Sequence, residues 1–314
     1  MRAVSVVGWG AVPTVTEIPE PPATPGRALV RMRAAGLNPV DLAIASGRFY
    51  MPLPDPPFVA GAECMGEVVS SAHLPAGTRV WCLPVTGAFA ELVSAPDESL
   101  APVPDGLDDV TAGGLGIAGL AGWMAVRVRG RLSPGETVVV LGASGVVGQT
   151  AIQAARLGGA RWVVAVARSG AGRERALALG ADVALATGPG LPEALRAGCG
   201  EGADLVVDAL WGDAAAAAIA VMRRGGRLVQ VGNAESPAME VVAGPLRGRL
   251  IDLLGFSVIV EDPAEVGRAY RELAEVSALG EVVLEVEAVP LGEAPAAWAR
   301  QAAGTGGRKL VLVS

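Results

Sequence analysis

The sequence predicts an α/β protein in which a doubly wound parallel sheet is joined to a second, mostly β unit. Two patterns support this prediction. From residue 135 to about residue 254, short aliphatic runs alternate with helical patterns, as in a parallel sheet covered by helices on both faces. Residues 1 to 116 instead alternate short apolar runs with Pro and Gly breaks, which is typical of a small antiparallel unit.

The pattern predicts the elements in chain order. Short runs of β-branched and apolar residues between turn residues predict strands in the first unit at 3–7, 28–34, 66–70, 78–82 and 89–94. A helix of small residues at 110–128 marks the domain boundary. The second unit has predicted strands at 138–141, 162–167, 204–209, 226–231 and 249–256, and helices from 151, at 173–179 and at 213–222. A helix after Pro263 and strands at 282–286 and 309–313 follow.

The parallel sheet is organised around the stretch 137–148, which reads TVVVLGASGVVG. Its aliphatic run predicts a strand buried on both faces, and a helical pattern follows the glycines. The glycine turn then lies at a helix N-terminus, where free N–H groups and the helix dipole favour a phosphate. The residues predicted to bind a pyrophosphate are Gly142, Ala143, Ser144, Gly145, Val146, Val147 and Gly148. Because Ala143 occupies the first glycine place of the dinucleotide fingerprint, an ordinary strand-to-helix turn is the alternative.

The end of the second strand indicates which dinucleotide binds. It falls about 20 residues after the glycine turn, where NAD-binding units place an Asp or Glu for the ribose hydroxyls. This chain has Arg168 there, followed by Ser169, with Arg173 soon after. A guanidinium beside a hydroxyl suits a 2′-phosphate, because each charge-assisted hydrogen bond contributes about 1.5–3 kcal/mol. The sequence therefore predicts NADP(H). The alternative, in which Arg168 is simply a solvated residue at the end of a strand, stays open.

The composition limits the classes of partner. The net charge is −7 and no large basic cluster is present, which argues against nucleic acid or an anionic membrane as partner. No apolar stretch is long enough to span a bilayer, and the N-terminus lacks a signal-peptide core. Cys64, Cys82 and Cys199 are an odd, widely spaced set without a disulfide pattern. We expect a cytoplasmic protein that binds a small molecule, and we interpret the single lysine, Lys309, as a compositional bias.

Several motifs occur in a fixed order along the whole chain. They include AAGLNPVDLAIASG at 34–47, FVAGAECMGEVV at 58–69, GAFAELV at 87–93, LSPGETVVVLGASGVVG at 132–148 and GGRLVQVGNA at 225–234. Together they resemble the medium-chain dehydrogenase/reductase superfamily, in particular its zinc-free quinone oxidoreductases similar to zeta-crystallin. The resemblance implies that residues 1–116 and 255–314 form a GroES-like catalytic domain and residues 117–254 a Rossmann dinucleotide-binding domain.

The resemblance also bears on metal binding. Where the alcohol dehydrogenase branch carries a zinc-binding Cys, this chain has Asn38. Where that branch has a His before a Glu, this chain has Ala62 before Glu63. Catalytic zinc needs thiolate, imidazole and a further sulfur or oxygen ligand, and these positions supply neither of the first two. We therefore expect no metal.

Hydride transfer without a Lewis acid needs an electron-poor acceptor, such as a quinone or an α,β-unsaturated carbonyl compound. The family pattern nominates Asn38 as a hydrogen-bond donor at the nicotinamide edge. Asp41 would orient Asn38 or cap the following helix. The phenol of Tyr50 is a candidate proton donor, or else a rim residue that packs beside Phe49. These residues predict a zinc-independent, NADPH-dependent quinone or enone reductase.

Two further expectations come from the resemblance. Gly232, Asn233 and Ala234 would lie along the nicotinamide half of the cofactor. Family members often dimerise by pairing the last strand of the Rossmann sheet, here Leu250 to Phe256, and such pairing removes an exposed apolar edge. We therefore expect a homodimer.

Three other functions stay open. An NADPH-binding redox sensor would bind the cofactor with little turnover. An enoyl-thioester reductase would perform the same chemistry on a larger acceptor. An S-adenosylmethionine methyltransferase is disfavoured by Arg168, because the ribose of that cofactor also calls for an acid at the end of the second strand.

Overall fold

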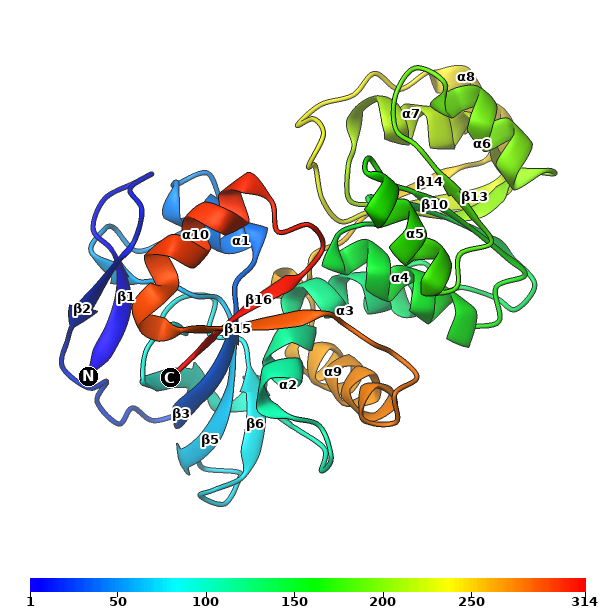
Figure 1. Ribbon diagram of the computed structural model, residues 1–314. Coiled ribbons are helices and arrows are strands. Elements are labelled where there is room, and N and C mark those ends of the chain that lie inside the picture. The colour runs from blue at the N-terminus through cyan, green and yellow to red at the C-terminus, as the bar shows by residue number, and fades with distance from the viewer. The chain divides into compact units, whose positions relative to one another are not determined.

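The structure, a computed structural model, describes residues 1–314 and divides into two compact units (Figure 1). Unit 1 comprises Met1–Ala118 and Ile259–Ser314, and unit 2 comprises Gly119–Val258. The sequence had placed the two boundaries at 116 and 254. In the structure the first change of unit falls inside helix α3, Ile117–Met124, and the second precedes Ile259.

Unit 1 is built on two β-sheets. A seven-stranded, mostly antiparallel sheet has the order β15-β16-β3-β5-β6-β8, with β7 also paired to β3, and a three-stranded sheet has the order β2-β1-β4. The strands are β1 Arg2–Val6, β2 Thr14–Glu17, β3 Arg27–Gly36, β4 Phe58–Val59, β5 Cys64–Ser70, β6 Arg79–Cys82, β7 Leu92–Pro96, β8 Ala101–Pro102, β15 Val286–Pro290 and β16 Lys309–Val313. The helices are α1 Pro39–Ala45, α2 Asp109–Leu115, α9 Pro263–Ala278 and α10 Ala294–Ala303.

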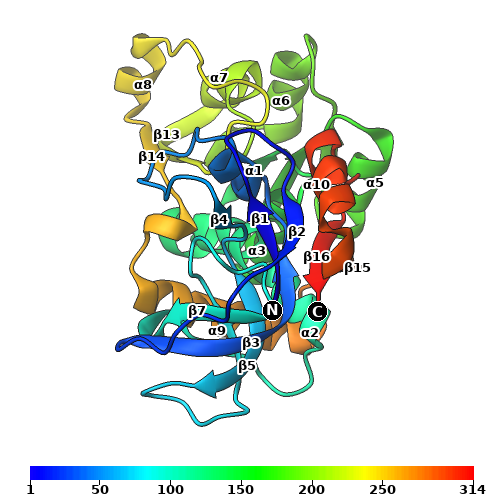
Figure 2. The same ribbon diagram turned by 90° about the vertical axis from the view of Figure 1, so that its left-hand side faces the viewer.

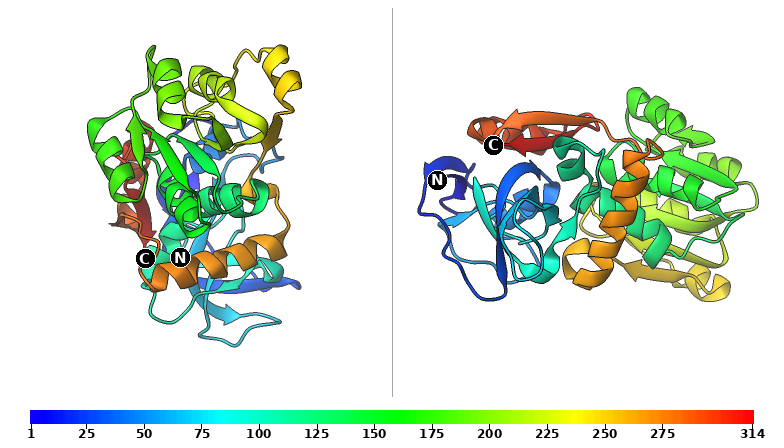
Figure 3. Two further views of the ribbon diagram at one scale, coloured as in Figure 1. Left: turned by 90° about the vertical axis from the view of Figure 1, so that its right-hand side faces the viewer. Right: turned by 90° about the horizontal axis from the view of Figure 1, so that it is seen from below.

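Strand β3 shows why this sheet forms. Ala28, Val30 and Met32 are buried, whereas Arg31 and Arg33 between and after them are exposed, which is the period of a half-buried strand. Beyond them both faces of the strand are covered, because α2 packs on its end. Figure 2 shows β3 and β5 running side by side, and Figure 3 shows the long helix α9 in orange. Both chain termini lie in this unit, close together in every view.

Unit 2 contains the predicted doubly wound sheet. Six parallel strands have the order β11-β10-β9-β12-β13-β14, with α4 and α5 on one face and α6 and α7 on the other (Figure 1). The strands are β9 Thr137–Leu141, β10 Trp162–Val166, β11 Val183–Leu185, β12 Ala203–Asp208, β13 Met222–Gln230 and β14 Asp252–Gly255. The helices are α4 Val146–Leu157, α5 Gly170–Ala178, α6 Leu191–Cys199, α7 Gly212–Ala220 and α8 Ala243–Arg249. The α/β fold class is confirmed.

Several expected elements differ from the observed ones. The helix expected at 110–128 is broken at Gly116, where no β-carbon fits because the Glu63 carboxylate occupies the space. The strand expected at 249–256 is shorter, since Arg249 ends helix α8. The prediction of a strand at 282–286 was wrong, because β15 begins at Val286, where its pairing with β16 starts. Helices α6, α8 and α10 were not predicted.

No single helix is long and apolar enough to cross a membrane. The segments Asp109–Leu115 and Ile117–Arg129 reach that length and composition only as a bent pair.

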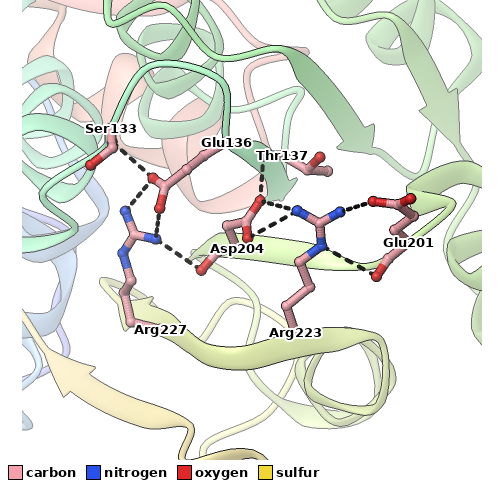
Figure 4. A network of polar contacts seen from close by, with 7 residues as sticks. All are labelled: Ser133, Glu136, Thr137, Glu201, Asp204, Arg223 and Arg227. Carbon is pink, nitrogen blue, oxygen red and sulfur yellow. Dashed lines mark hydrogen bonds and ion pairs between the residues drawn. The ribbon is translucent and has the colours of Figure 1, made fainter.

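The amino edge of the parallel sheet is tied together by a polar network (Figure 4). The guanidinium of Arg227 donates to both carboxylate oxygens of Glu136, at 2.8 and 2.6 Å, and to backbone carbonyls including that of Gly130. Nearby, the carboxylate of Asp204 accepts from Arg223 and from the N–H of Thr137 at 2.8 Å. These contacts join charged side chains and backbone groups of this edge to one another within the unit, and the opposite, carboxyl edge is where open parallel sheets bind ligands.

Candidate functional site

The glycine turn joins β9 to α4 at the carboxyl edge of the parallel sheet. Gly142 has a φ of +80°, the left-handed conformation that favours glycine. A β-carbon on Gly148 would lie 2.5 Å from the Cα of Ala143, so this glycine allows the helix to pack directly on the turn. This explains why Ala143 can occupy the first glycine place of the dinucleotide fingerprint. The residue that needs a positive φ in this turn is Gly142, one position earlier.

The first turn of α4 has the properties of a phosphate site. Its N-cap is Gly145, which is exposed and has no side chain to satisfy the first N–H groups of the helix. These belong to Val146, Val147 and Gly148, three of the predicted residues. Gly122 of α3 lies against the Val147 carbonyl with no room for a β-carbon, so the helix start is held firmly. The turn therefore fits a pyrophosphate, which its N–H groups and helix dipole would bind.

The end of β10 lies beside this turn. A β-carbon on Gly172 would be 2.7 Å from the β-carbon of Ser144. Ser169 caps helix α5 by accepting from the N–H of Gly172 at 3.1 Å. Arg173 donates to the carbonyl of Arg168 at 3.0 Å, so both Ser169 and Arg173 shape the loop. The exposed side chain of Arg168 makes no hydrogen bond or ion pair and is available to a ligand.

The loops after β12 and β13 run together at the same edge. Gly232 donates to the carbonyl of Asp208 at 3.3 Å, and Ala234 donates to that of Ala209 at 3.1 Å. Asn233 between them is exposed. Burial raises the pKa of the Asp208 carboxyl, and the nearby Glu235 adds to this effect. All three predicted nicotinamide-side residues therefore lie on the carboxyl edge that also holds the glycine turn.

In unit 1, Asn38 lies in a buried polar cluster just before α1. Its backbone N–H donates to Asp41 at 2.7 Å, and the other carboxylate oxygen of Asp41 accepts from the N–H of Ala62 at 2.9 Å. The side-chain amide donates to the Gly36 carbonyl at 2.9 Å and to Glu63 at 2.7 Å. The carboxylate of Asp41 therefore contacts the backbone of Asn38 at the start of α1, a geometry compatible with both roles expected of it, orienting Asn38 and capping the helix. The amide nitrogen of Asn38 is engaged within the unit.

The centre of this cluster is the carboxylate of Glu63, which is fully buried. It also accepts from the indole N–H of Trp81 at 2.9 Å and from the N–H of Ile117 at the start of α3. The ammonium of Lys309 lies 3.5 Å from it and donates to the side-chain oxygen of Asn38. Glu63 and Lys309 thus hold Asn38 from two sides.

Sequence reasoning did not nominate Lys309 or the role of Glu63. The available signal was the single lysine of a chain rich in arginine, which we had interpreted as a compositional bias. Tyr50, by contrast, is 66% exposed, with its ring 4.3 Å from that of Phe49. Among the described residues, no three His, Cys, Asp or Glu side chains gather as metal ligands.

Two family models match the chain. The alcohol dehydrogenase GroES-like domain matches residues 24–105, and the zinc-binding dehydrogenase model matches residues 146–275. The chain is 30% identical to the quinone oxidoreductase of Mus musculus over 245 residues, which is 74% of this chain and 73% of that protein. The solved quinone oxidoreductase of Thermus thermophilus, also solved in complex with NADPH, is 32% identical, with a TM-score of 0.85 and full coverage of both chains.

Other relatives are much longer. The chain is 31% identical over 297 residues to one component of the phenolphthiocerol/phthiocerol polyketide synthase of Mycobacterium tuberculosis. That match covers 90% of this chain but spans only 13% of the synthase component. The matched models, the identity to full-length quinone oxidoreductases and the two-unit fold agree with the motifs found in the sequence. The chain therefore belongs to the medium-chain dehydrogenase/reductase superfamily of NAD(P)H-dependent oxidoreductases.

Proposed function

We propose that the protein is an NADPH-dependent, zinc-independent reductase of quinones or α,β-unsaturated carbonyl compounds. The observation that supports it best is the glycine turn between β9 and α4, with the available guanidinium of Arg168 beside it. The turn suits a pyrophosphate, and Arg168 suits a 2′-phosphate where an NAD site would carry an acid. The relatives solved with NADPH support the same cofactor.

When bound, NADPH would supply a hydride. The residues proposed to hold it are those of the turn, Arg168 with its supporting Ser169 and Arg173, and the loop from Gly232 to Ala234. In unit 1, Glu63 and Lys309 keep the side-chain amide of Asn38 in one orientation. We therefore propose two roles for Asn38: it contacts the nicotinamide, and it positions the residues around it. Tyr50 stays our candidate proton donor, since its side chain is exposed.

The proposed acceptors follow from the zinc ligands that this cluster lacks. Asn38 and Ala62 stand where zinc ligands would be and offer neither thiolate nor imidazole, while the donors of the cluster are already paired with one another. An alkoxide usually needs a metal or a strong acid, whereas a developing enolate or hydroquinone anion can be stabilised by hydrogen-bond donors alone, so quinones and enones are the proposed acceptors. The likeness to a segment of a polyketide synthase keeps an enoyl thioester as a further acceptor to test.

The test is NADPH oxidation by the purified protein with four acceptors: an ortho-quinone, a para-quinone, an enone and an enoyl thioester. Turnover with any of them supports the reductase, and the preferred acceptor identifies the substrate class. Tight NADPH binding without turnover on all four would contradict the proposal and favour a binding or sensing role.

We also propose a homodimer through β14. This strand is the edge of the parallel sheet, and Leu250 and Leu253 beside and within it are 58% and 39% exposed. Pairing of two β14 edges would cover these side chains and the unpaired backbone groups. Light scattering on the purified chain should then give the mass of a dimer, and a monomer at micromolar concentration would contradict this arrangement.

A further inference from the structure

A cavity of about 350 Å³ opens at the carboxyl edge of the parallel sheet, on the side of β14. Trp211, Gln230, Asn233 and Pro237 line it, together with Leu253–Gly255 of β14. Its size is at the lower end of small-molecule pockets, and it combines apolar walls with two side-chain amides, as such pockets do. No sequence pattern pointed to Trp211 as a binding residue.

The backbone of Trp211 is strained. Its φ of 63° and ψ of −160° lie in a region that essentially only glycine occupies without cost. The next residue, Gly212, also has a positive φ, of 64°, and there the glycine removes the strain. A tryptophan at the first of these positions therefore costs folding free energy that a glycine would not, and strained residues of this kind concentrate at binding sites.

The neighbouring loops hold Trp211 in this conformation. One carboxylate oxygen of the buried Asp208 accepts from the N–H of Leu210 at 2.8 Å and from that of Trp211 at 2.9 Å. The loop after β13 then covers the turn, because the N–H of Glu235 donates to the Leu210 carbonyl at 2.9 Å. The conformation is thus set by contacts on both sides of the residue and not by the indole alone.

We propose that the indole of Trp211 forms one wall of a binding site for a flat conjugated ring. Its polar partners are the amide of Asn233 and the side-chain oxygen of Gln230, whose amide nitrogen already donates to the Gly232 carbonyl at 2.9 Å. An indole offers a large rigid face for stacking. Asn233 makes no hydrogen bond through its side chain, so its amide is available to a carbonyl or carboxamide on the ring. This inference rests on the proposed function, because the ring would be either the nicotinamide of NADPH or the ring of a quinone acceptor.

A packing role is the competing explanation, since Trp211 also contacts the core of unit 2. Three variants separate the two roles. Trp211→Phe keeps an aromatic ring, Trp211→Ala removes the ring but keeps the strain, and Trp211→Gly removes both. Because glycine relieves the strained backbone at this position, the Gly variant should melt at a higher temperature than the Ala variant. Trp162→Ala, at the amino end of β10, is the matched control for loss of a half-exposed tryptophan.

The experiment measures NADPH affinity, affinity for 2′-phospho-ADP-ribose, which lacks the nicotinamide, and KM for an ortho-quinone. Stacking on nicotinamide predicts that the Ala and Gly variants both lose about 3- to 10-fold in NADPH affinity, while the Phe variant and the fragment affinity change little. Stacking on the acceptor instead predicts that the Ala and Gly variants raise the KM for the quinone by about 3- to 10-fold and leave the NADPH affinity unchanged.

If wild-type protein turns over and all three variants match it in affinity and KM, this inference falls and the proposed function stands. It also falls if the losses of NADPH affinity follow the melting temperatures of the variants, so that the Gly variant binds NADPH more tightly than the Ala variant. If the wild-type protein neither binds NADPH nor turns over, both proposals fall together.

Discussion

The ammonium of Lys309 lies 3.5 Å from the carboxylate of Glu63, and the two side chains are only 3% and 0% exposed. They lie far apart in the sequence: Lys309 is the first residue of β16, and Glu63 immediately precedes β5. The room for them comes from Gly36, where a β-carbon would lie 2.6 Å from Glu63 and 2.9 Å from Lys309. The pair is therefore an internal charge pair, and it fixes the amide of Asn38 between its members.

Lys309→Met should destabilise the protein by about 3–5 kcal/mol, because it leaves the buried carboxylate of Glu63 without its counter-charge. The free energy of unfolding in urea measures this loss. The neighbouring Arg308→Met removes only an exposed, solvent-screened ion pair with Glu285 and should lower the free energy of unfolding far less. Equal losses in the two variants would show that the buried pair has no special energetic role.

Asp41 makes stability depend on pH. Burial, the largest effect, raises the pKa of Asp41 to about 7 against the lowering effects of the Asn38 N–H and of Lys309. A carboxyl whose folded-state pKa is raised contributes stability that is present below its unfolded pKa and is lost as pH rises through the folded value. The unfolding free energy of wild type minus that of Asp41→Asn should therefore fall between about pH 4 and about pH 7. A difference that rises over this range, or stays flat, would mean that Asp41 is ionised throughout.

Much of this fold is predictable from local pattern, and the exceptions share a cause. The alternation of aliphatic runs and helices in unit 2 depends on neighbours along the chain, so the parallel sheet and its glycine turn follow from sequence. The break at Gly116 depends on Glu63, which is distant in sequence. Lys309 and Glu63 likewise meet only through pairing of β16 with β3. No local pattern encodes such contacts.

The residues of the candidate site divide in the same way into those that local sequence patterns predict and those that depend on tertiary contacts. The glycine turn and Arg168 lie on one βαβ unit, so their spacing can be interpreted directly from the sequence. The saturation of Asn38 by Glu63 and Lys309 could not be foreseen, nor could the strained backbone of Trp211, because both arise from side chains brought together by tertiary structure.

Glu136→Gln should weaken unit 2. Burial opposes ionisation of Glu136, yet hydrogen bonds from Arg227 and from the N–H of Ser133 prevail and lower its pKa. A lowered pKa gives stability that is present above the unfolded value and is lost as pH falls through the folded one. The variant should lose about 1–3 kcal/mol near neutral pH, and the loss should shrink in acid. A loss that is independent of pH in urea unfolding would assign it to packing instead of charge.

Arg168→Glu should weaken NADPH binding more than tenfold, by loss of a charge-assisted hydrogen bond to the 2′-phosphate and by repulsion from the new carboxylate. NADH affinity should change little. Arg224→Glu, an exposed arginine near the amino edge of the same sheet, is the control for the change in net charge. Equal losses for the two cofactors on Arg168→Glu would remove the 2′-phosphate assignment.

The most direct test of the central claim is the ratio of kcat/KM for NADPH and for NADH in the wild-type protein, measured by cofactor oxidation with one ortho-quinone. The account predicts measurable oxidation with a preference for NADPH of more than about tenfold, since each hydrogen bond to the 2′-phosphate contributes about 1.5–3 kcal/mol. A preference for NADH, or no oxidation of either cofactor, would contradict it.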